Sequence, residues 1–514
     1  MSRSQRFVTG LLSSYASIGV NILYTIASVP LALHYLNKEE FGLWALVTQL
    51  AGYLMLLEFG MRGSVARLLS DHKDRMEDGV YGNILRTGAR VFAIQGFVVT
   101  LLGLAVAWFA PDLLGLPVRL QHSFAILMVA QAIIGGLGLA LGALGSPLWC
   151  HQRLDISNLA SSISLVVAFA ALWLGFHWGW QIYSLTLSTI IGFLVGSAIT
   201  YFACLRLGLY PTRANRGHFD GPLFRELFHF GSGLFLMNLG AQLASASQVI
   251  VVSRLLGVEA ATVWSVATKL FNMAQQFVSR VLDSSAGGLA EMVVREEFAQ
   301  LQKRFHDLVA ISALMAVAAS AAIALTNGAF IELWTSGRVT WAPWNNMLLA
   351  CVLFSMAVTR CHTGLVGISK LIRGMKYAYL IEGLAFVALA LLLVPRTGLT
   401  GLLIAALICN VAITGNYGIN RSAHYFDISR LQVIGWIARP TVILVATGGL
   451  FSLFQFSRLA ELQALPRFVI GIIAYCGMVI PAIWFFGMKP SLRLEIKSLI
   501  SKIQNKAKST LRIA

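Results

Sequence analysis

Residues 30–70, PLALHYLNKEEFGLWALVTQLAGYLMLLEFGMRGSVARLLS, decide the fold because a degenerate copy of this stretch returns about 220 residues later. Eight identities hold at one fixed offset without a gap, and they pair Leu36, Glu39, Trp44, Thr48, Leu50, Ser64, Ala66 and Leu69 with Leu256, Glu259, Trp264, Thr268, Leu270, Ser284, Ala286 and Leu289. Apolar composition alone does not readily produce so many matches in one register. The chain therefore contains two copies of one membrane unit, an arrangement typical of transporters.

The composition indicates a polytopic membrane protein. Hydrophobic residues make up 57% of the chain, charged residues only 12%, and the mean hydropathy is +0.74, which excludes a soluble domain of this length. Because a helical span needs about 20 apolar residues, we expect about fourteen spans, near residues 9–35, 41–63, 84–109, 122–148, 157–176, 181–205, 228–255, 260–288, 305–326, 342–368, 376–395, 398–420, 434–455 and 467–487.

The fold expected from these spans is all-α, with two pseudo-symmetric lobes of six helices and two further C-terminal helices. The expected segments are an N-terminal lobe, a cytoplasmic linker, a C-terminal lobe, two additional spans and a basic amphipathic cytoplasmic tail, at residues 1–205, 206–226, 227–420, 434–487 and 488–514. The connections are short, so none can fold as a separate catalytic domain. We therefore expect a transport protein and not an enzyme.

Basic residues predict the orientation, since loops rich in lysine and arginine stay on the cytoplasmic side. With both termini cytoplasmic, 28 of the 39 basic residues fall in cytoplasmic segments and 7 in the opposite loops. The apolar run after Arg3 and Arg6 is too long for a signal peptide and is expected to be an uncleaved first span. The net charge of +17 follows from this topology and favours membrane lipids as partners over nucleic acid.

No cofactor or metal is expected. The six cysteines lie in or at the ends of apolar spans without metal-type spacing. His34, His229 and His362 stand alone, without clustered acids.

Polar stripes at helical spacing mark the expected transport path, because polar groups inside a bilayer usually face a protein-lined cavity. In the span near 260–288, Lys269, Asn272, Gln276, Arg280 and Asp283 recur at intervals of three or four. Further polar candidates lie on the first, second and seventh spans, and they are Asn21, Gln49, Asn238, Gln242 and Gln248. Hydrogen bonding between helices is the alternative role for such side chains.

Three cations at membrane depth, Lys269, Arg280 and Arg360, are the candidates for binding an anionic substrate. An unpaired cation at the bilayer centre costs at least about 2.5 kcal/mol, so each needs a wet cavity or a partner. The alternative is internal pairing, for which Asp283 and Glu382 are the available carboxylates.

Four charged residues are candidates for gating or ion coupling: Glu58, Arg62, Asp283 and Glu382. Glu58 and Arg62 lie one helical turn apart, which favours a mutual pair with a structural or gating role, while contact with substrate or protons stays open. Glu382 could carry a proton, but no second acid shares its helix face.

The run PLALHYLNKEEFGLWALVTQL, followed by LLEFGMRGSVARLL and later by LWCHQRLDISNLASSISLVV, resembles the bacterial polysaccharide flippases. These O-antigen and exopolysaccharide translocases form part of the multidrug/oligosaccharidyl-lipid/polysaccharide exporter superfamily. The resemblance covers roughly residues 5–420. It implies a V-shaped cationic cavity, alternating access, and passage of an undecaprenyl-pyrophosphate-linked oligosaccharide across the bacterial inner membrane. It also implies a polysaccharide polymerase and chain-length machinery as partners.

Two related functions remain as alternatives. A drug or cation antiporter of the same superfamily would need an acidic pocket, whereas the interior charges here are mostly positive. A peptidoglycan-precursor flippase would share the cationic cavity, although its characteristic opening segments are not evident.

Overall fold

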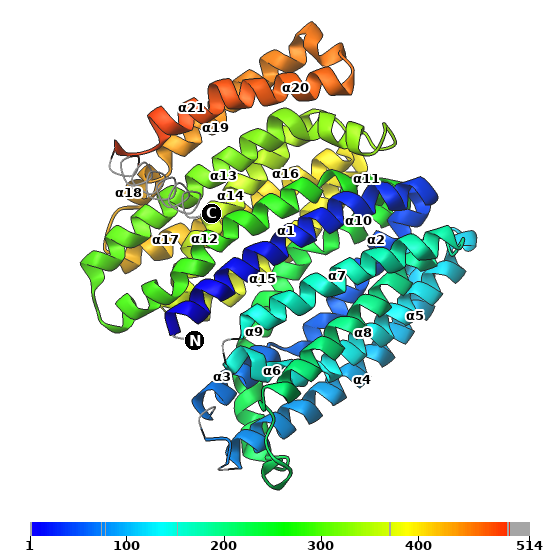
Figure 1. Ribbon diagram of the computed structural model, residues 1–514. Coiled ribbons are helices and arrows are strands. Elements are labelled where there is room, and N and C mark those ends of the chain that lie inside the picture. The colour runs from blue at the N-terminus through cyan, green and yellow to red at the C-terminus, as the bar shows by residue number, and fades with distance from the viewer. Residues whose placement is uncertain are drawn as a thin grey trace, which may run out of the picture. The chain divides into compact units, whose positions relative to one another are not determined.

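The computed structural model describes residues 3–72, 75–77, 79–151, 153–369, 372–490 and 493. Helices of the α, 3₁₀ and π types account for all the regular structure in these residues (Figure 1). This confirms the expected all-α polytopic class. Thirteen helical segments of the described chain are long and apolar enough to cross a membrane.

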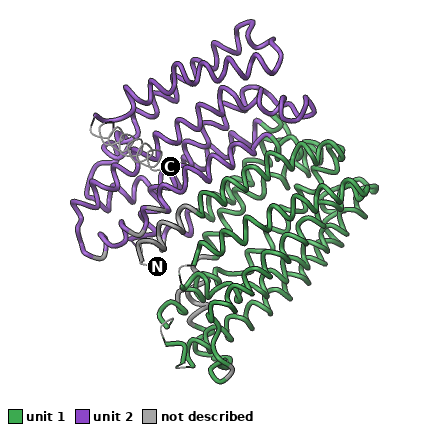
Figure 2. Tube along the Cα trace, viewed as in Figure 1, with its two compact units in different colours: residues 1–266, 379–399 green, residues 267–378, 400–514 purple. Residues whose placement is uncertain are grey.

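The chain forms two compact units, shown in green and purple in Figure 2. Unit 1 comprises residues 1–266 and 379–399. In it, α4 packs along α5, α7 packs along α8, and α1 packs along α7. Its helices are α1 (Arg3–Tyr35), α2 (Lys38–Leu54), η1 (Met55–Glu58), α3 (Met61–His72), α4 (Val80–Leu114), α5 (Val118–Ala140), α6 (Gly142–Cys150), α7 (Leu154–His177), α8 (Tyr183–Arg206), η2 (Arg213–Asn215), α9 (Gly221–Ser245), α10 (Ser247–Leu256), α11 (Val258–Ala267) and most of α15 (Ile372–Thr397).

Unit 2 comprises residues 267–378 and 400–514. The long helix α13 is its centre, since α12, α14, α19 and α20 all pack against it. The helices are α12 (Lys269–Val294), α13 (Phe298–Trp334), α14 (Trp344–Ile368), α16 (Leu399–Cys409), η3 (Asn410–Gly415), α17 (Asn416–Tyr425), α18 (Arg430–Gly435), α19 (Ala438–Phe456), η4 (Arg458–Glu461), α20 (Ala464–Ala474), η5 (Tyr475–Val479), α21 (Ile480–Ala482) and η6 (Ile483–Gly487).

The eighth predicted span, near 260–288, is two helices instead of one. It is divided at Thr268 into the short apolar α11 and the longer α12. The polar stripe lowers the hydropathy of α12, and α11 has only 10 residues, so neither is among the thirteen apolar spans. The other thirteen predicted spans each coincide with one of the observed segments.

Local sequence explains where the repeated helices begin. Asn37 forms a capping box at the start of α2: its side chain accepts from the Glu40 amide at 2.8 Å, and Glu40 accepts from the Asn37 amide at 3.0 Å. Such a box satisfies amides that the first helical turn leaves unpaired. The equivalent position before α11 is Gly257, whose φ of 87° ends α10. The two copies thus begin their second helix at equivalent positions with different caps.

The repeat is visible as a symmetric contact inside unit 1. A Cβ on Gly42 of α2 would lie 1.8 Å from the carbonyl oxygen of Val258, at the start of α11. The Thr262 hydroxyl of α11 donates to the carbonyl oxygen of Lys38. In the repeat, Lys38 corresponds to Val258 and Gly42 corresponds to Thr262. Gly42 therefore contacts the counterpart of Lys38, and Lys38 contacts the counterpart of Gly42. This reciprocity is the mark of a two-fold relation.

The lobe boundaries predicted at residues 205 and 227 remain a prediction. The two compact units are defined by contacts between helices, whereas the predicted lobes follow the sequence repeat. The predicted amphipathic tail lies almost entirely outside the described residues.

Candidate functional site

The polar stripe lies on one face of a single helix, α12. Asn272, Gln276, Arg280 and Asp283 are exposed, and Lys269 is partly buried. The opposite face packs into unit 2 through Phe271, Val278, Leu282 and Leu289, each 8% exposed or less. The helical period separates the two faces, because positions three and four residues apart share one side.

This face is long on the scale of a membrane. Fourteen residues separate Lys269 from Asp283, which at 1.5 Å per residue is a rise of about 21 Å. The hydrocarbon core is about 30 Å thick. Since a row of amides and charges against lipid would be costly, the face needs water or polar partners along most of its length.

Arg360 is an exposed residue on a mostly buried helix, α14. Its neighbours on α14 are buried, with Thr359, Cys361 and His362 exposed by 6% or less. The Arg360 Nη2 lies 3.1 Å from the Asp283 Oδ1 of α12, and the two side chains are 51% and 41% exposed. The alternative of internal pairing therefore holds for Arg360, whose partner is Asp283.

The face carries a positive charge. Among the described residues, no carboxylate lies within ion-pair distance of Lys269 or Arg280. Three cations and one carboxylate leave a formal charge of +2 on the α12 face and Arg360. An exposed pair such as Arg360–Asp283 contributes only about 0–1 kcal/mol, so an incoming anion could displace the carboxylate at little cost.

A polar network behind Arg360 was not predicted. Ser355 and Thr359 of α14 donate to the Asn410 Oδ1 at 2.6 and 3.2 Å, and Asn410 donates to Thr414 at 3.3 Å. Asn410 opens the π-helical segment η3, whose wider turn lets the side chain reach across to α14. Ser355 and Thr359 are four residues apart, and this spacing is the only signal the sequence offers. The network fixes the register of the helix that carries Arg360.

The polar candidates of unit 1 are spread over several helices. Asn21 of α1 and Asn238 of α9 are exposed, while Gln49, Gln242 and Gln248 are partly buried. The Gln248 Nε2 of α10 donates to the Ala244 carbonyl of α9 at 2.9 Å, a local bond across the break between these two helices. The Tyr53 hydroxyl of α2 donates to the Gln242 backbone carbonyl at 3.2 Å, so this bond between helices does not involve the Gln242 side chain, whose role remains a prediction.

The gating candidates differ in their surroundings. Arg62 Nε lies 3.3 Å from Glu58 Oε1 across the junction of η1 and α3, so the predicted pair is present. Glu382 of α15 is buried at 8% exposure, close to where Gly383 packs against the Gly240 carbonyl of α9. Within the described residues, no group of three or more histidines, cysteines and acids could hold a metal ion.

The sequence matches the family of polysaccharide biosynthesis proteins over residues 9–285. The chain belongs to this family. No curated protein matches the sequence. The family assignment thus rests on the N-terminal half and on a stretch that includes most of α12.

Several solved transporter structures share the fold. The lipid II flippase MurJ, in an inward closed conformation, is similar with a TM-score of 0.67 at 15% identity, covering 91% of this chain and 97% of that one. An outward-facing multidrug resistance MATE transporter has a TM-score of 0.62 at 13% identity, covering 82% and 95%. A transporter from Pyrococcus furiosus, described as having a binding pocket of reverse polarity, has a TM-score of 0.58 at 13% identity, covering 82% and 96%.

Proposed function

We propose that this family member is a flippase that moves an undecaprenyl-pyrophosphate-linked oligosaccharide, an O-antigen or exopolysaccharide repeat unit, across the membrane by alternating access. The observation that carries the proposal is the α12 face, on which Lys269 and Arg280 have no carboxylate partner in the described chain. A pyrophosphate is a dianion or more at neutral pH, and guanidinium and ammonium groups bind phosphate oxygens by charge-assisted hydrogen bonds.

The amides beside these cations suit the sugars. Asn272 and Gln276 are exposed between Lys269 and Arg280 and can both donate and accept hydrogen bonds to hydroxyls. A headgroup that cannot cross hydrocarbon alone would exchange water for these groups, while its lipid tail stays in the bilayer. Arg360 would join the site when the pyrophosphate displaces Asp283.

Movement between two lobes would change the side to which the site is open. The proposal places these lobes at residues 1–205 and 227–420, joined by the linker 206–226, as the repeat predicts. Glu58, Arg62, Asp283 and Glu382 would then serve in gating or ion coupling. The proposed location is the bacterial inner membrane with both termini cytoplasmic, and a polymerase and chain-length machinery would receive the product.

The two alternatives differ in the charge and the ligand that they require. A drug or cation antiporter would need an acidic face, and the positive α12 face argues against it. A peptidoglycan-precursor flippase would suit the same cations, and the likeness to the lipid II flippase concerns the fold alone. Which lipid-linked intermediate accumulates on depletion separates these functions.

The test is depletion in the native host, followed by rescue with variants. Depletion should leave lipid-linked oligosaccharide on the cytoplasmic leaflet, and the wild-type chain should clear it. K269A and R280A should fail to clear it while protein levels stay near normal. Because a hydrogen bond to a charged group contributes about 1.5–3 kcal/mol, each loss should slow translocation by about tenfold or more.

Arg295 provides the matched control for these variants. It lies just beyond the last turn of α12 and pairs with Glu291 on an exposed surface, so R295Q removes one cation outside the polar face. R295Q should clear the intermediate at the wild-type rate. Normal export by a chain with neutral side chains at both 269 and 280 would refute the assignment of the site.

A further inference from the structure

A cavity of about 800 Å³ lies inside unit 1 and shares no residue with the α12 face. Residues of α3, α5, α6, α7 and α8 line it. Its volume is in the range of pockets that hold small organic ligands. Neither the polar stripes nor the proposed substrate path accounts for it.

Two glycines, Gly138 of α5 and Gly145 of α6, leave space in the wall of the cavity. Its lining runs from Gly138 to Trp149 on α5 and α6, and from Gly192 to Tyr201 on α8. These stretches correspond to rises of about 16 and 14 Å, or about half of the hydrocarbon thickness. A Cβ on Gly138 or Gly145 would meet only Phe193 or Thr200, at 3.5 and 3.4 Å. The cavity therefore has the length of one leaflet's hydrocarbon and unobstructed walls.

The walls are mainly apolar, and among the described lining residues one charged side chain borders them. Arg62 is that side chain, and its Nη2 would lie 3.3 Å from a Cβ on Gly142. It is 50% exposed, and its partner Glu58, at 3.3 Å, leaves other donors of the guanidinium available. The cavity thus combines an apolar channel with one cation.

Ser146 also borders the cavity, and its buried hydroxyl indicates that a ligand binds there. It is 1% exposed, and its hydroxyl has no hydrogen-bond partner among the described residues. Buried hydroxyls in native proteins are nearly always bonded. A polar atom of a bound molecule, placed between Arg62 and Ser146, would satisfy it.

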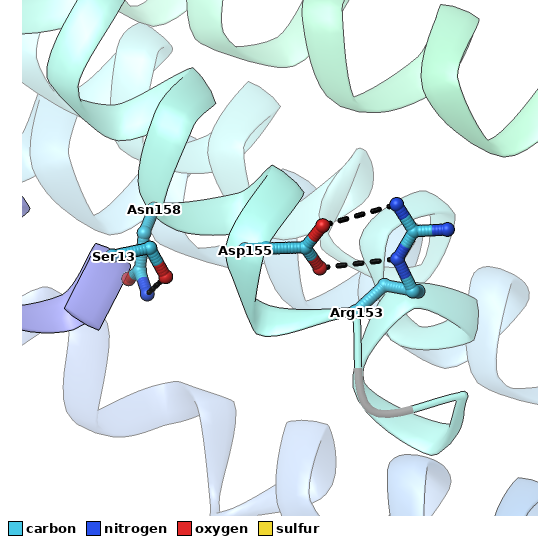
Figure 3. A network of polar contacts seen from close by, with 4 residues as sticks. All are labelled: Ser13, Arg153, Asp155 and Asn158. Atoms are coloured by element: carbon cyan, nitrogen blue, oxygen red, sulfur yellow. Dashed lines mark hydrogen bonds and ion pairs between the residues drawn. The ribbon is translucent and has the colours of Figure 1, made fainter. Parts of the chain in front are cut away.

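The helix α7 on the opposite wall is held by polar contacts at its N-terminal end (Figure 3). Arg153 donates to both carboxylate oxygens of Asp155 at 3.0 Å, and Asn158 donates to Ser13 and Ser14 of α1 at 3.0 and 2.9 Å. The hydrogen bonds to Asp155 raise the pKa of Arg153. These contacts fix the wall that carries Ser157 and Ser161, so the cavity is a formed site.

We propose that this cavity binds one lipid that carries a phosphate on an apolar chain, with the phosphate at Arg62 and the chain along Gly138 of α5 and Gly145 of α6. Guanidinium groups are well suited to phosphate, and the length of the channel matches a chain in one leaflet. Trp149 and Tyr201, which are 58% and 39% exposed, also border the cavity, and Trp and Tyr are the residues enriched at membrane interfaces. The lipid could come from the bilayer or be the carrier chain of the transported molecule, and only the second source rests on the proposed function.

Native mass spectrometry of the purified chain can test this with three separate probes: phosphatidylglycerol, undecaprenyl phosphate and diacylglycerol. The wild-type chain should retain one phosphate-bearing lipid and much less diacylglycerol. G138L and G145L should fill the channel and lower retention by at least about tenfold, a change of 1.4 kcal/mol or more. R62Q should equalise retention of the phosphate-bearing lipids and diacylglycerol. Preference for undecaprenyl phosphate over phosphatidylglycerol would identify the carrier chain, and the converse a bilayer lipid.

The control is G449L on α19 in unit 2, because a Cβ at Gly449 meets nothing within 4 Å. It adds the same side chain outside the cavity and should retain lipid like the wild type. Melting temperatures show whether the variants fold. If the leucine variants unfold, the retention of phosphate-bearing lipids and diacylglycerol by R62Q tests the proposal. Retention by folded G138L and G145L equal to that of G449L, or equal binding of diacylglycerol and phosphate lipids by the wild type, would overturn the proposal. Lipid binding by a chain without flippase activity would contradict the proposed function but would support the proposed lipid site.

Discussion

At the residue scale, the ion pair between Arg360 and Asp283 is the contact whose role is least obvious from its geometry. The two charges are 3.1 Å apart, yet both side chains are about half exposed. In such a setting the pair contributes little to stability. Its location on the α12 face therefore suggests that Asp283 holds Arg360 until an anionic headgroup replaces it.

Replacing each partner by its neutral isostere separates a substrate role from a structural one. D283N should lower stability by less than about 1 kcal/mol and should keep or strengthen binding of the lipid pyrophosphate, because Arg360 is released. R360Q should be equally stable but bind the headgroup about tenfold more weakly, since it loses one charge-assisted bond. Thermal melting and a binding titration measure the two effects.

The double variant D283N/R360Q completes a cycle that isolates the coupling between the two side chains. Asp283 was also a candidate for ion coupling, and the same experiment addresses that role. Equal loss of transport in D283N and R360Q, with binding intact in D283N, would show that the carboxylate itself is needed. The displacement mechanism would then be wrong.

At the element scale, close packing of α2 on α11 depends on one glycine. A Cβ on Gly42 would approach the Val258 carbonyl to 1.8 Å, and backbone cannot yield as a side chain does. Overpacking of this kind costs about 1–3 kcal/mol. G42A should therefore lower the melting temperature in detergent, although alanine is the better helix former.

Gly52 on the same helix is the matched control. A Cβ there would meet only the flexible end of the Gln242 side chain, at 3.1 Å, so G52A should be neutral or slightly stabilising. Equal melting temperatures for G42A and G52A would mean that α2 and α11 are not packed as described.

The helical class, the repeat and the face of α12 were predictable because each depends on periodicity, which the sequence displays directly. The break at Thr268 was not, because neither a glycine nor a proline stands there to mark a change of helix. The left-handed Phe59 before Gly60, with φ of 50° and 69°, likewise ends the second predicted span at Glu58. Pairings such as Arg360 with Asp283, 77 residues apart, require tertiary structure.

At the scale of the whole molecule, the symmetric contact offers a way to test alternating access. Cysteines at Lys38 and Thr262 would join equivalent helices of the two repeats, where the Thr262 hydroxyl contacts the Lys38 carbonyl. In a chain whose six native cysteines are replaced, a short thiol crosslinker at this pair should stop translocation if the predicted lobes must separate here. Cleavage of the crosslinker should restore translocation.

The control pair is S13C with N158C, whose side chains lie 3.0 Å apart within the predicted N-terminal lobe. A crosslink at the control pair leaves the lobes free and should leave translocation unchanged. Normal translocation with the 38–262 crosslink fully formed would show that these helices do not part during transport, and the site on α12 would then need another route of access.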